Sequence, residues 1–567
     1  MSDSIEKEES RAIYDVRSGE LRNILHSSAF HEVTDLEKLA LSNEKEASKI
    51  LSEAQANLEF SAGTGYASEL RRGFSFLSIL GIGFGLTNSW LGISASLLVS
   101  ISSGGPMMVI YGVIILASIS LCIGATLSEM ASAMPNAAGQ IYWAMKLAPE
   151  KYSRLFAYVT GIFGWLGALL TGASVTMAIA TSFVGIYVLY HPDVSVQRWH
   201  IFLLYELLNL LILTFNIYEK PLPSISKASL FTSVSSCIII MIVVLSMHKG
   251  EWQTAEFVFV DFNNNTGWSS GGIAFIVGLI NPNWSFSCLD AAAHIAEESL
   301  NPAVQVPQAI FTTIVVGFFS AMAYSIAIFF SIRNLDDVLA SNTGVPIMDI
   351  FYQSTESKAV AVGLEMCIVM TLIGCNIACH TWAARVSWSF SRDNGFPLSK
   401  YWSRVNSNTG APVNAHLMSC GVVAVVGFIF LASTTAFNAV IVCCVTFLLL
   451  SYLPATFCLI YRRNTIKPGP FWLNKLGLFC NIVLICYAIF AFVFFNFPFV
   501  MPVTGGNMNY SSVVFAIVFI FCVVDWLVRG RKEYIGMQER EQMREEYAKK
   551  LTTQISHIEA VVSQSEA

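Results

Sequence analysis

"GLINPNWSFSCLD", residues 278–290, interrupts a long hydrophobic stretch with two Asn, a Pro, two Ser and an Asp. Proline has no backbone N–H, so it breaks the hydrogen-bond ladder of a helix. In hydrocarbon a freed backbone group is costly, and such a break persists only around a wet cavity, a ligand or protein partners. The segment is therefore predicted to open a membrane-spanning helix at Asn281 and Pro282, where a binding site would form.

The composition around this segment is that of a polytopic membrane protein. Of 567 residues, 54% are hydrophobic and only 13% are charged, far from the usual soluble mixture. A helix needs about 20 apolar residues to cross a bilayer. The predicted fold is all-α, with twelve transmembrane helices near 74–101, 105–130, 155–189, 199–217, 223–247, 273–296, 306–332, 359–389, 414–432, 435–461, 474–497 and 511–529.

Polar segments flank this membrane region, which is expected to span 73–530. Residues 1–72 are acidic and contain no apolar run of a signal peptide, so they are predicted to be a cytosolic, largely disordered tail. Residues 531–567 are predicted to be a second, solvated cytosolic tail. Lys and Arg concentrate in the loops that this topology places inside, as the positive-inside rule requires. The net charge of −6 lies mainly in the tails and gives no reason to expect nucleic-acid binding.

A second interruption occurs in the first span. Gly81, Gly83 and Gly85 precede "TNS" at 87–89. The two interruptions correspond if residues 74–247 and 273–461 are five-helix repeats of opposite topology, followed by two peripheral helices over 474–529. Paired interruptions of this kind are the best sequence indication of a transporter binding site. The alternative is a pair of ordinary kinks packed by neighbouring helices.

Several motifs resemble one family of transporters. "GIGFGLTNSWLGIS" (81–94), "SEMASAMPNAAGQIYW" (128–143), "NPNWSFSCLDAAAHIAEE" (281–298) and "SRDNGFPLS" (391–399) resemble the amino acid–polyamine–organocation superfamily, and within it the fungal amino acid/choline permeases. The resemblance implies a 5+5 inverted-repeat fold with two extra C-terminal helices. It also implies secondary active transport, driven by protons, in the plasma membrane.

The residues near the two interruptions suggest how a cation could be held. Choline has no N–H donor, so its site needs aromatic faces and a carboxylate. Trp284 and Trp90 are predicted to form an aromatic wall, with Trp165 as a third member; ordinary packing is the alternative. Asp290 is predicted either to balance the substrate charge or to carry the coupled proton, unless it only caps a helix or forms a salt bridge. Further polar contacts are expected from Thr87, Asn88, Ser89, Ser285 and Ser287.

Charged residues at the inner helix ends suggest a gate. Glu129, Glu297 and Arg72 are predicted to take part in cytosolic ion pairs that open and close during transport, although exposed charges often contribute little. In the loop between spans 5 and 6, Asn264 begins the sequon Asn264-Asn265-Thr266 and is a candidate for glycosylation.

Other functional classes find no support in the sequence. The 13 Cys lie mostly in apolar runs without the spacing of a metal site. There is no Walker motif and no nucleophile–base arrangement, so neither an enzyme nor a bound metal or cofactor is expected, apart from the proton as coupling ion.

The leading hypothesis is therefore a proton symporter that imports choline or a related cation such as ethanolamine. A permease for 4-aminobutyrate or other amino acids is the first alternative, and a non-transporting nutrient sensor is the second. The expected partners are the small substrate, membrane lipid and, for the tails, regulatory kinases or ubiquitin ligases.

Overall fold

The computed structural model describes residues 74–299, 301–406 and 408–536, with 539, 540, 542, 545 and 549 beyond them. The predicted N-terminal tail, including Arg72, lies outside the described residues. Within the described part the secondary structure is helical, without a β-strand; one isolated bridge joins Phe74 to Ser299.

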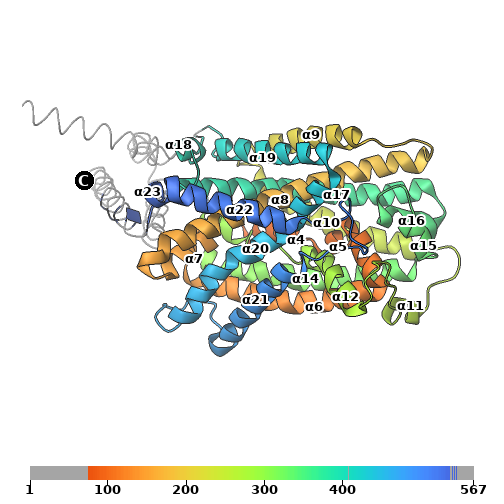
Figure 1. Ribbon diagram of the computed structural model, residues 1–567, viewed down its shortest axis with the longest axis horizontal. Helices are drawn as coiled ribbons and strands as arrows, with labels where there is room; N and C mark the ends of the chain where they lie inside the picture. The colour runs from red at the N-terminus through yellow and green to blue at the C-terminus, as the bar shows by residue number, and fades with distance from the viewer. Residues whose placement is uncertain are drawn as a thin grey trace, which may run out of the picture.

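The long helices run side by side along the longest axis of the molecule (Figure 1). Of the helices in the described residues, eleven are long and apolar enough to cross a membrane. They are α4 with α5 (Phe76–Thr87, Ser89–Ala95), α6 (Leu97–Ala133), α8 (Glu150–Tyr190), α9 (Arg198–Phe215), α10 (Leu222–Met247), α14 (Pro302–Phe330), α17 (Lys358–Arg392), α19 (Val413–Ala432), α20 (Thr434–Arg462), α21 (Asn474–Phe494) and α22 with its extension (Ser511–Glu533).

The sixth predicted span is the one missing from that list. It is divided into α12 (Gly271–Gly278), α13 (Ile280–Ser285) and the 3-10 helix η1 (Ala293–Glu298). Each piece is too short to count as a spanning helix by itself, since a crossing takes about 20 helical residues.

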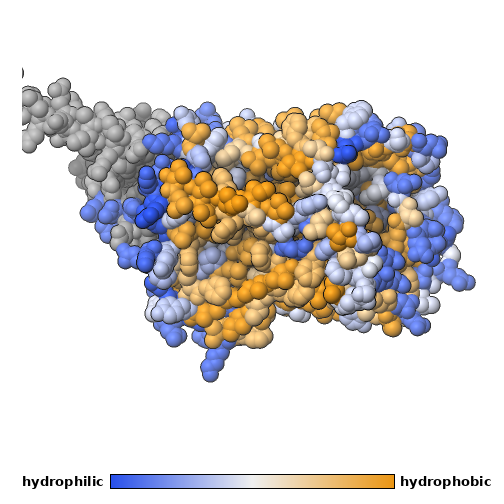
Figure 2. Space-filling model, in the orientation of Figure 1, coloured by the Kyte–Doolittle hydropathy of each residue, from blue (hydrophilic) through white to orange (hydrophobic). Residues whose placement is uncertain are grey.

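The surface is that of a membrane protein. A broad hydrophobic band covers the middle of the visible face, and hydrophilic residues gather at both ends (Figure 2). Leu207, Phe319 and Phe519 project from outer helices and are more than 60% exposed. Apolar side chains in such numbers are stable when they face lipid rather than water. The predicted all-α polytopic membrane fold is confirmed.

Contacts between helix ends agree with alternating crossings. The backbone N–H of Phe74, at the start of span 1, donates to the carbonyl of Glu298, at the end of span 6 (3.1 Å). Lys358, at the start of α17, donates to the carbonyl of Leu189, at the end of α8 (2.8 Å). The two residues of each pair lie on the same side of the membrane only if the divided span 6 also crosses it.

The helix contacts form two matching sets. In the first five spans α8 packs on α9, and in the next five α17 packs on α19. Contacts between the two sets match as well. The contact of α8 with α20 corresponds to that of α17 with α10, and the contact of α4 with α14 corresponds to that of α12 with α6. Since five spans separate equivalent helices, the second set crosses in the opposite direction, as an inverted repeat does.

Short helices cover the two ends of the bundle. The helices α7 (Gln140–Leu147) and α18 (Ser399–Trp402) lie at one end, whereas α11 (Ala255–Phe259), α15 (Leu335–Leu339) and α16 (Pro346–Thr355) lie at the other (Figure 1). The buried helix α7 follows α6 after the loop 134–139. The helix α17 ends at Arg392, just before Gly395 and Pro397, residue types that stop a helix.

The chain after residue 530 begins differently from the prediction. α22 (Ser511–Asp525) continues through the π-helix η2 (Trp526–Gly530) into α23 (Arg531–Glu533). Tyr534 is buried edge-on against the ring of Tyr158 (5.7 Å between centroids), and buried Arg540 pairs with Asp393. The prediction of a solvated tail from residue 531 is wrong for these residues, because aromatic packing and an ion pair hold them on the bundle.

Candidate functional site

The interruption of span 1 lies at Asn88. This residue separates α4 from α5 with φ 26° and ψ 66°, values that L-residues seldom adopt. Its side-chain oxygen accepts a hydrogen bond from Ser233 of α10 (3.1 Å), which fixes the break. Gly81, by contrast, lies inside α4 against the backbone of Ser226, so it allows α10 to approach closely and does not open the helix.

The interruption of span 6 lies later than predicted. The helical backbone ends at Ser285 and resumes at Ala293, and Cys288 between them has φ +63°. Asn281 and Pro282 belong to α13. The prediction that these two residues open the backbone is therefore wrong; the unwound segment is 286–292.

A hydrogen bond from another helix explains why Pro282 is tolerated. Proline in a helix leaves the carbonyl four residues earlier without its donor. That carbonyl belongs to Gly278, and the hydroxyl of Ser100 donates to it (3.3 Å). The side chain of Asn281 donates in turn to the carbonyl of Gly92 in α5 (3.2 Å). The two broken spans are thereby joined side by side.

Asp290 lies in the unwound segment and is fully buried. Its Oδ1 accepts from the hydroxyl of Tyr452 on α20 (2.7 Å), and its Oδ2 accepts from the amide of Gln140 on α7 (2.8 Å). His294 Nε2 lies 3.3 Å from Oδ2. Each oxygen of this buried carboxylate therefore accepts one hydrogen bond from a side chain.

The contact between His294 and a backbone carbonyl indicates which ring nitrogen carries a hydrogen. Its Nδ1 lies 2.7 Å from the carbonyl oxygen of Ala137. Because a carbonyl only accepts, Nδ1 carries a hydrogen. Nε2, on the other side of the ring, lies 3.3 Å from Oδ2 of Asp290 and forms no hydrogen bond among the described residues.

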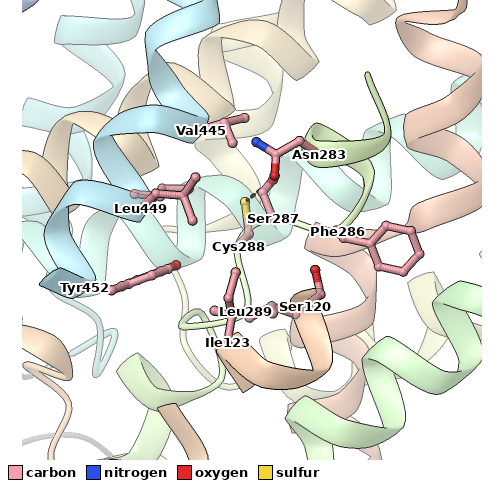
Figure 3. A pocket seen from close by; sticks show the side chains of 11 residues that line it. Ser120, Ile123, Asn283, Phe286, Ser287, Cys288, Leu289, Val445, Leu449 and Tyr452 are labelled. Carbon is pink, nitrogen blue, oxygen red and sulfur yellow. Dashed lines mark hydrogen bonds between the residues drawn. The ribbon is translucent and has the colours of Figure 1, made fainter. Parts of the chain in front are cut away.

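A small pocket lies beside this pair. Side chains of α20 face the unwound segment across it, with Tyr452 and Leu449 opposite Ser287 and Cys288 (Figure 3). Ser120 and Ile123 of α6 also line it. The pocket has room for about one water molecule, too little for a small organic cation, so the protein is in a closed form.

The three predicted tryptophans do not converge on this pocket. Trp90 is fully buried, donates to Ser233 (3.1 Å) and packs on Tyr324 of α14. Trp165 donates to Ser387 of α17 (3.0 Å) and packs on Phe396. Trp284, on the last turn of α13, adjoins the unwound segment. An aromatic wall that includes Trp90 and Trp165 is therefore not formed in this closed structure, because their side chains are committed elsewhere.

The five predicted polar residues mostly satisfy the broken backbone. Thr87 donates to the carbonyl of Ser287 (2.9 Å), which links the two interruptions directly. Ser285 and Ser287 donate to carbonyls within their own segment. Ser89 differs: its hydroxyl is buried against Gly317 of α14 and has no hydrogen-bond partner in the described part of the chain.

Comparisons with known proteins identify the family. A family model described as "Amino acid permease" matches residues 74–521, which include both interruptions and Asp290. The chain belongs to the amino acid permease family. A protein named choline transporter in Saccharomyces cerevisiae is 52% identical over 484 residues, 85% of this chain and 86% of that protein. The 7-keto 8-aminopelargonic acid transporter of the same yeast is 35% identical over 80% of this chain and 91% of that protein. The swainsonine transporter of Arthroderma benhamiae is 32% identical over 82% of this chain and 92% of that protein.

Ion pairs join the inner end of span 6 to α17 of this permease. Glu298 receives two hydrogen bonds from Arg385 (2.9 and 3.2 Å), and Glu297 receives two from Arg392 (2.9 and 3.2 Å). All four side chains are almost completely buried. These pairs connect a broken span to a continuous helix.

Glu129 has a different setting. It receives two hydrogen bonds from Arg463 (2.6 and 2.8 Å) and one from the backbone of Leu473 (2.7 Å). These contacts tie α6 to α20 and to the start of α21, all continuous helices, so they suit a fixed brace better than a gate. The gating roles stay predictions, and Arg72 lies outside the described residues.

Sequence reasoning missed several residues of the site. His294 had a signal, since "DAAAH" places it four residues after Asp290. Gln140 and Tyr452 had none, because each lies more than 100 positions from Asp290. Glu365 of α17 had a signal as an acid inside a span; it is fully buried, with the side chain of Ser182 on α8 beside its carboxylate.

The glycosylation candidate lies in the loop before α12. The side-chain amide of Asn264 donates to the carbonyl of Trp268 (2.8 Å), and its oxygen accepts from Thr266. Trp268 also donates to Pro498, in the connection between the last two spans (3.0 Å). Both loops therefore lie at the same end of the bundle; glycosylation stays a prediction.

Proposed function

We propose that this permease imports choline, together with a proton, across the plasma membrane, with both termini in the cytosol. The observation that carries the proposal is the buried carboxylate of Asp290 in the unwound segment of span 6. The 52% identity to a protein named choline transporter supports the same substrate. Ethanolamine, which is a smaller cation, is the related substrate to compare with choline.

The surroundings of the pocket suit a cation without N–H donors. Such a head group is held by negative charge and aromatic faces rather than by hydrogen bonds. Asp290 supplies the charge, and Tyr452 and Phe286 line the pocket. Trp284 is the predicted tryptophan nearest in the chain to the unwound segment. We expect segment 286–292 to move when the site opens, since the closed pocket is too narrow for choline.

The Asp290–His294 pair is the proposed proton carrier. Its partners from the cytosolic side, Gln140 and the carbonyl of Ala137, come from α7 and the loop before it. A displacement of α7 would remove both partners at once and expose the pair to the cytosol. Glu365 is the second candidate, because it too is a buried acid in a span.

The direct test is uptake by cells that express the chain, with labelled choline, ethanolamine and 4-aminobutyrate as substrates. Concentrative choline uptake that rises at acidic external pH and collapses with a proton uncoupler is expected. Choline uptake that ignores the uncoupler would contradict proton coupling. No uptake of any substrate by protein present at the surface would favour a nutrient sensor.

An amino acid substrate is the alternative that the comparisons favour. The relative at 35% identity is named for a compound with an amino group and a carboxylic acid. A carboxylate would require N–H groups at a helix end, and the break at Asn88 is where span 1 exposes them. Uptake of 4-aminobutyrate with no uptake of choline would establish this alternative.

A further inference from the structure

We propose that His380, His416 and Cys420 form a site for a soft metal ion, monovalent copper, between α17 and α19. The cysteines were expected to bind no metal, since none has metal-site spacing in the sequence. The fold places His380 against a pair on α19 that is spaced by one helical turn. All three side chains are buried, and their ligand atoms lie within 4.8 Å of one another.

The separations fit ligation of one ion. With a metal–sulfur bond of about 2.3 Å and a metal–nitrogen bond of about 2.0 Å, neighbouring ligand atoms lie roughly 3.5 to 3.7 Å apart. Cys420 Sγ lies 3.2 Å from His380 Nδ1 and 3.7 Å from His416 Nδ1. The three ligand atoms lie within 4.8 Å of one another, so the two imidazole rings would move closer together around a bound ion.

His416 is already held in the tautomer that a ligand needs. Its Nε2 lies 3.0 Å from the carbonyl oxygen of Leu213 at the end of α9. That nitrogen therefore carries the hydrogen, and Nδ1 presents a lone pair. A ligating histidine usually donates its other N–H to a backbone carbonyl in this way, which fixes the ring.

Hydrogen bonds within the cluster do not satisfy His380. Its Nδ1 faces the thiol of Cys420, whereas its buried Nε2 has no hydrogen-bond partner in the described part of the chain. In either neutral tautomer one nitrogen thus remains unused. The cluster is not closed by its own hydrogen bonds, and it retains capacity to bind.

Charge selects the ion. Binding replaces the thiol hydrogen of Cys420 by the metal, and the proton leaves to water. A thiolate, two neutral imidazoles and Cu⁺ sum to zero, which suits a buried position in a membrane protein. Zn²⁺ would instead leave a net charge of +1 at the site. Arg385, which is paired with Glu298, is close enough to interact electrostatically with His416, so it would repel that charge. Thiolate is also a soft ligand, which favours Cu⁺.

The site lies apart from the transport pocket. Its ligands come from α17 and α19, and the fixing carbonyl comes from α9, three continuous helices that pack on one another. None of the three ligands lines the pocket beside Asp290. An ion here would tie the continuous helices together, whatever the substrate.

The test is metal content of the purified full-length protein. After incubation with Cu⁺ under reducing conditions and passage over a chelator, elemental analysis should find about one copper per chain. X-ray absorption should report sulfur and nitrogen ligands. Thermal stability should rise with added Cu⁺, because an ion that binds only the folded state stabilises it.

Matched variants make the test specific. Cys420→Ser should weaken copper retention at least about 100-fold, more than loss of an outer contact does, whereas Cys237→Ser, at a buried cysteine of α10, should retain it. His380→Gln provides a second variant if Cys420→Ser does not fold. Equal copper in both cysteine variants, no retained copper, or retention of zinc alone would overturn the proposal.

Discussion

Asp290 is the residue on which the proposed chemistry depends. The sequence identifies it as an acid within a span, and the structure adds the three side chains that keep it buried: Tyr452, Gln140 and His294. These partners argue against a helix cap alone, whereas counter-charge for the substrate, proton carrier and salt bridge with His294 all stay possible roles of this position. A helix cap alone would not need two side-chain donors and an imidazole.

Asp290→Asn should abolish concentrative, pH-dependent choline uptake while the protein still reaches the membrane. The amide keeps the size of the side chain but removes the charge that pairs with the substrate and with His294. A loss of at least about tenfold in uptake, equivalent to 1.4 kcal/mol, is expected in a radiolabel assay. Asp336→Asn, on the outer helix α15, is the control and should behave as the wild type. Retained acid-stimulated uptake in Asp290→Asn would exclude it as the carrier.

Trp90 and Trp284 should respond differently to substitution. Trp90→Phe removes a buried hydrogen bond to Ser233, so it should lower stability by about 1–3 kcal/mol with little change in apparent affinity. Trp284→Ala should sharply weaken choline affinity at normal surface expression. Thermal unfolding and saturation kinetics separate the two. The reverse pattern would restore Trp90 to the binding site.

At the scale of elements, the short helix α7 and the loop before it supply a partner to each member of the Asp290–His294 pair. Gly139 begins it with φ +52°, and a side chain there would press on the ring of His294 at about 3.0 Å. Only glycine adopts this backbone readily. The loop before α7 thus depends on one glycine to bring Ala137 and Gln140 to the pair.

Gly139→Ala should therefore impair folding and transport together. The left-handed backbone alone costs about 1–2 kcal/mol for a residue with a Cβ, and the contact with His294 adds to it. Gly363→Ala in α17 is the matched control, because a Cβ there meets nothing within 4 Å, and alanine favours a helix. Thermal stability and uptake of both variants would be compared; an unaffected Gly139→Ala would contradict the role of this turn.

Ser100→Ala tests the compensation at Pro282. The substitution leaves the carbonyl of Gly278 without its donor in a buried position, at a cost of about 1–3 kcal/mol. Ser118→Ala on the same helix, whose hydroxyl bonds only within α6 and is exposed, should be nearly neutral. Equal melting temperatures for the two variants would show that the Pro282 break is satisfied in another way.

At the scale of the whole molecule, two buried ion pairs join the end of span 6 to α17, and we predict that they act as a gate at the cytosolic end. Glu298→Gln would leave Arg385 as a buried charge without its counter-charge, which costs about 3–5 kcal/mol. The permease should unfold at lower temperature or open toward the cytosol, and accessibility of a cysteine in the pocket, Cys288, to a thiol reagent distinguishes the two. Glu356→Gln, in an exposed pair with Arg333, should leave the stability nearly unchanged, because solvent screens such a pair. Wild-type stability and accessibility in Glu298→Gln would rule out this gate.

The order of residues was enough to predict the membrane fold, the approximate spans, the paired interruptions and the presence of an acid, Asp290, within a span. Hydrophobic runs and helix breakers are local properties, and an acid among apolar residues is visible without partners. It placed the second opening too early, at Pro282, because a proline is a local signal whereas the donor that satisfies Gly278 comes from another helix.

Which side chains meet depends on how the helices pack against one another. Trp90 and Trp165 turned out to bond Ser233 and Ser387, Gln140 and Tyr452 converged on Asp290, and His380 joined His416 and Cys420. Each of these contacts joins segments distant in the chain. Their free energy depends on packing between helices, which hydropathy and spacing along a single chain do not encode.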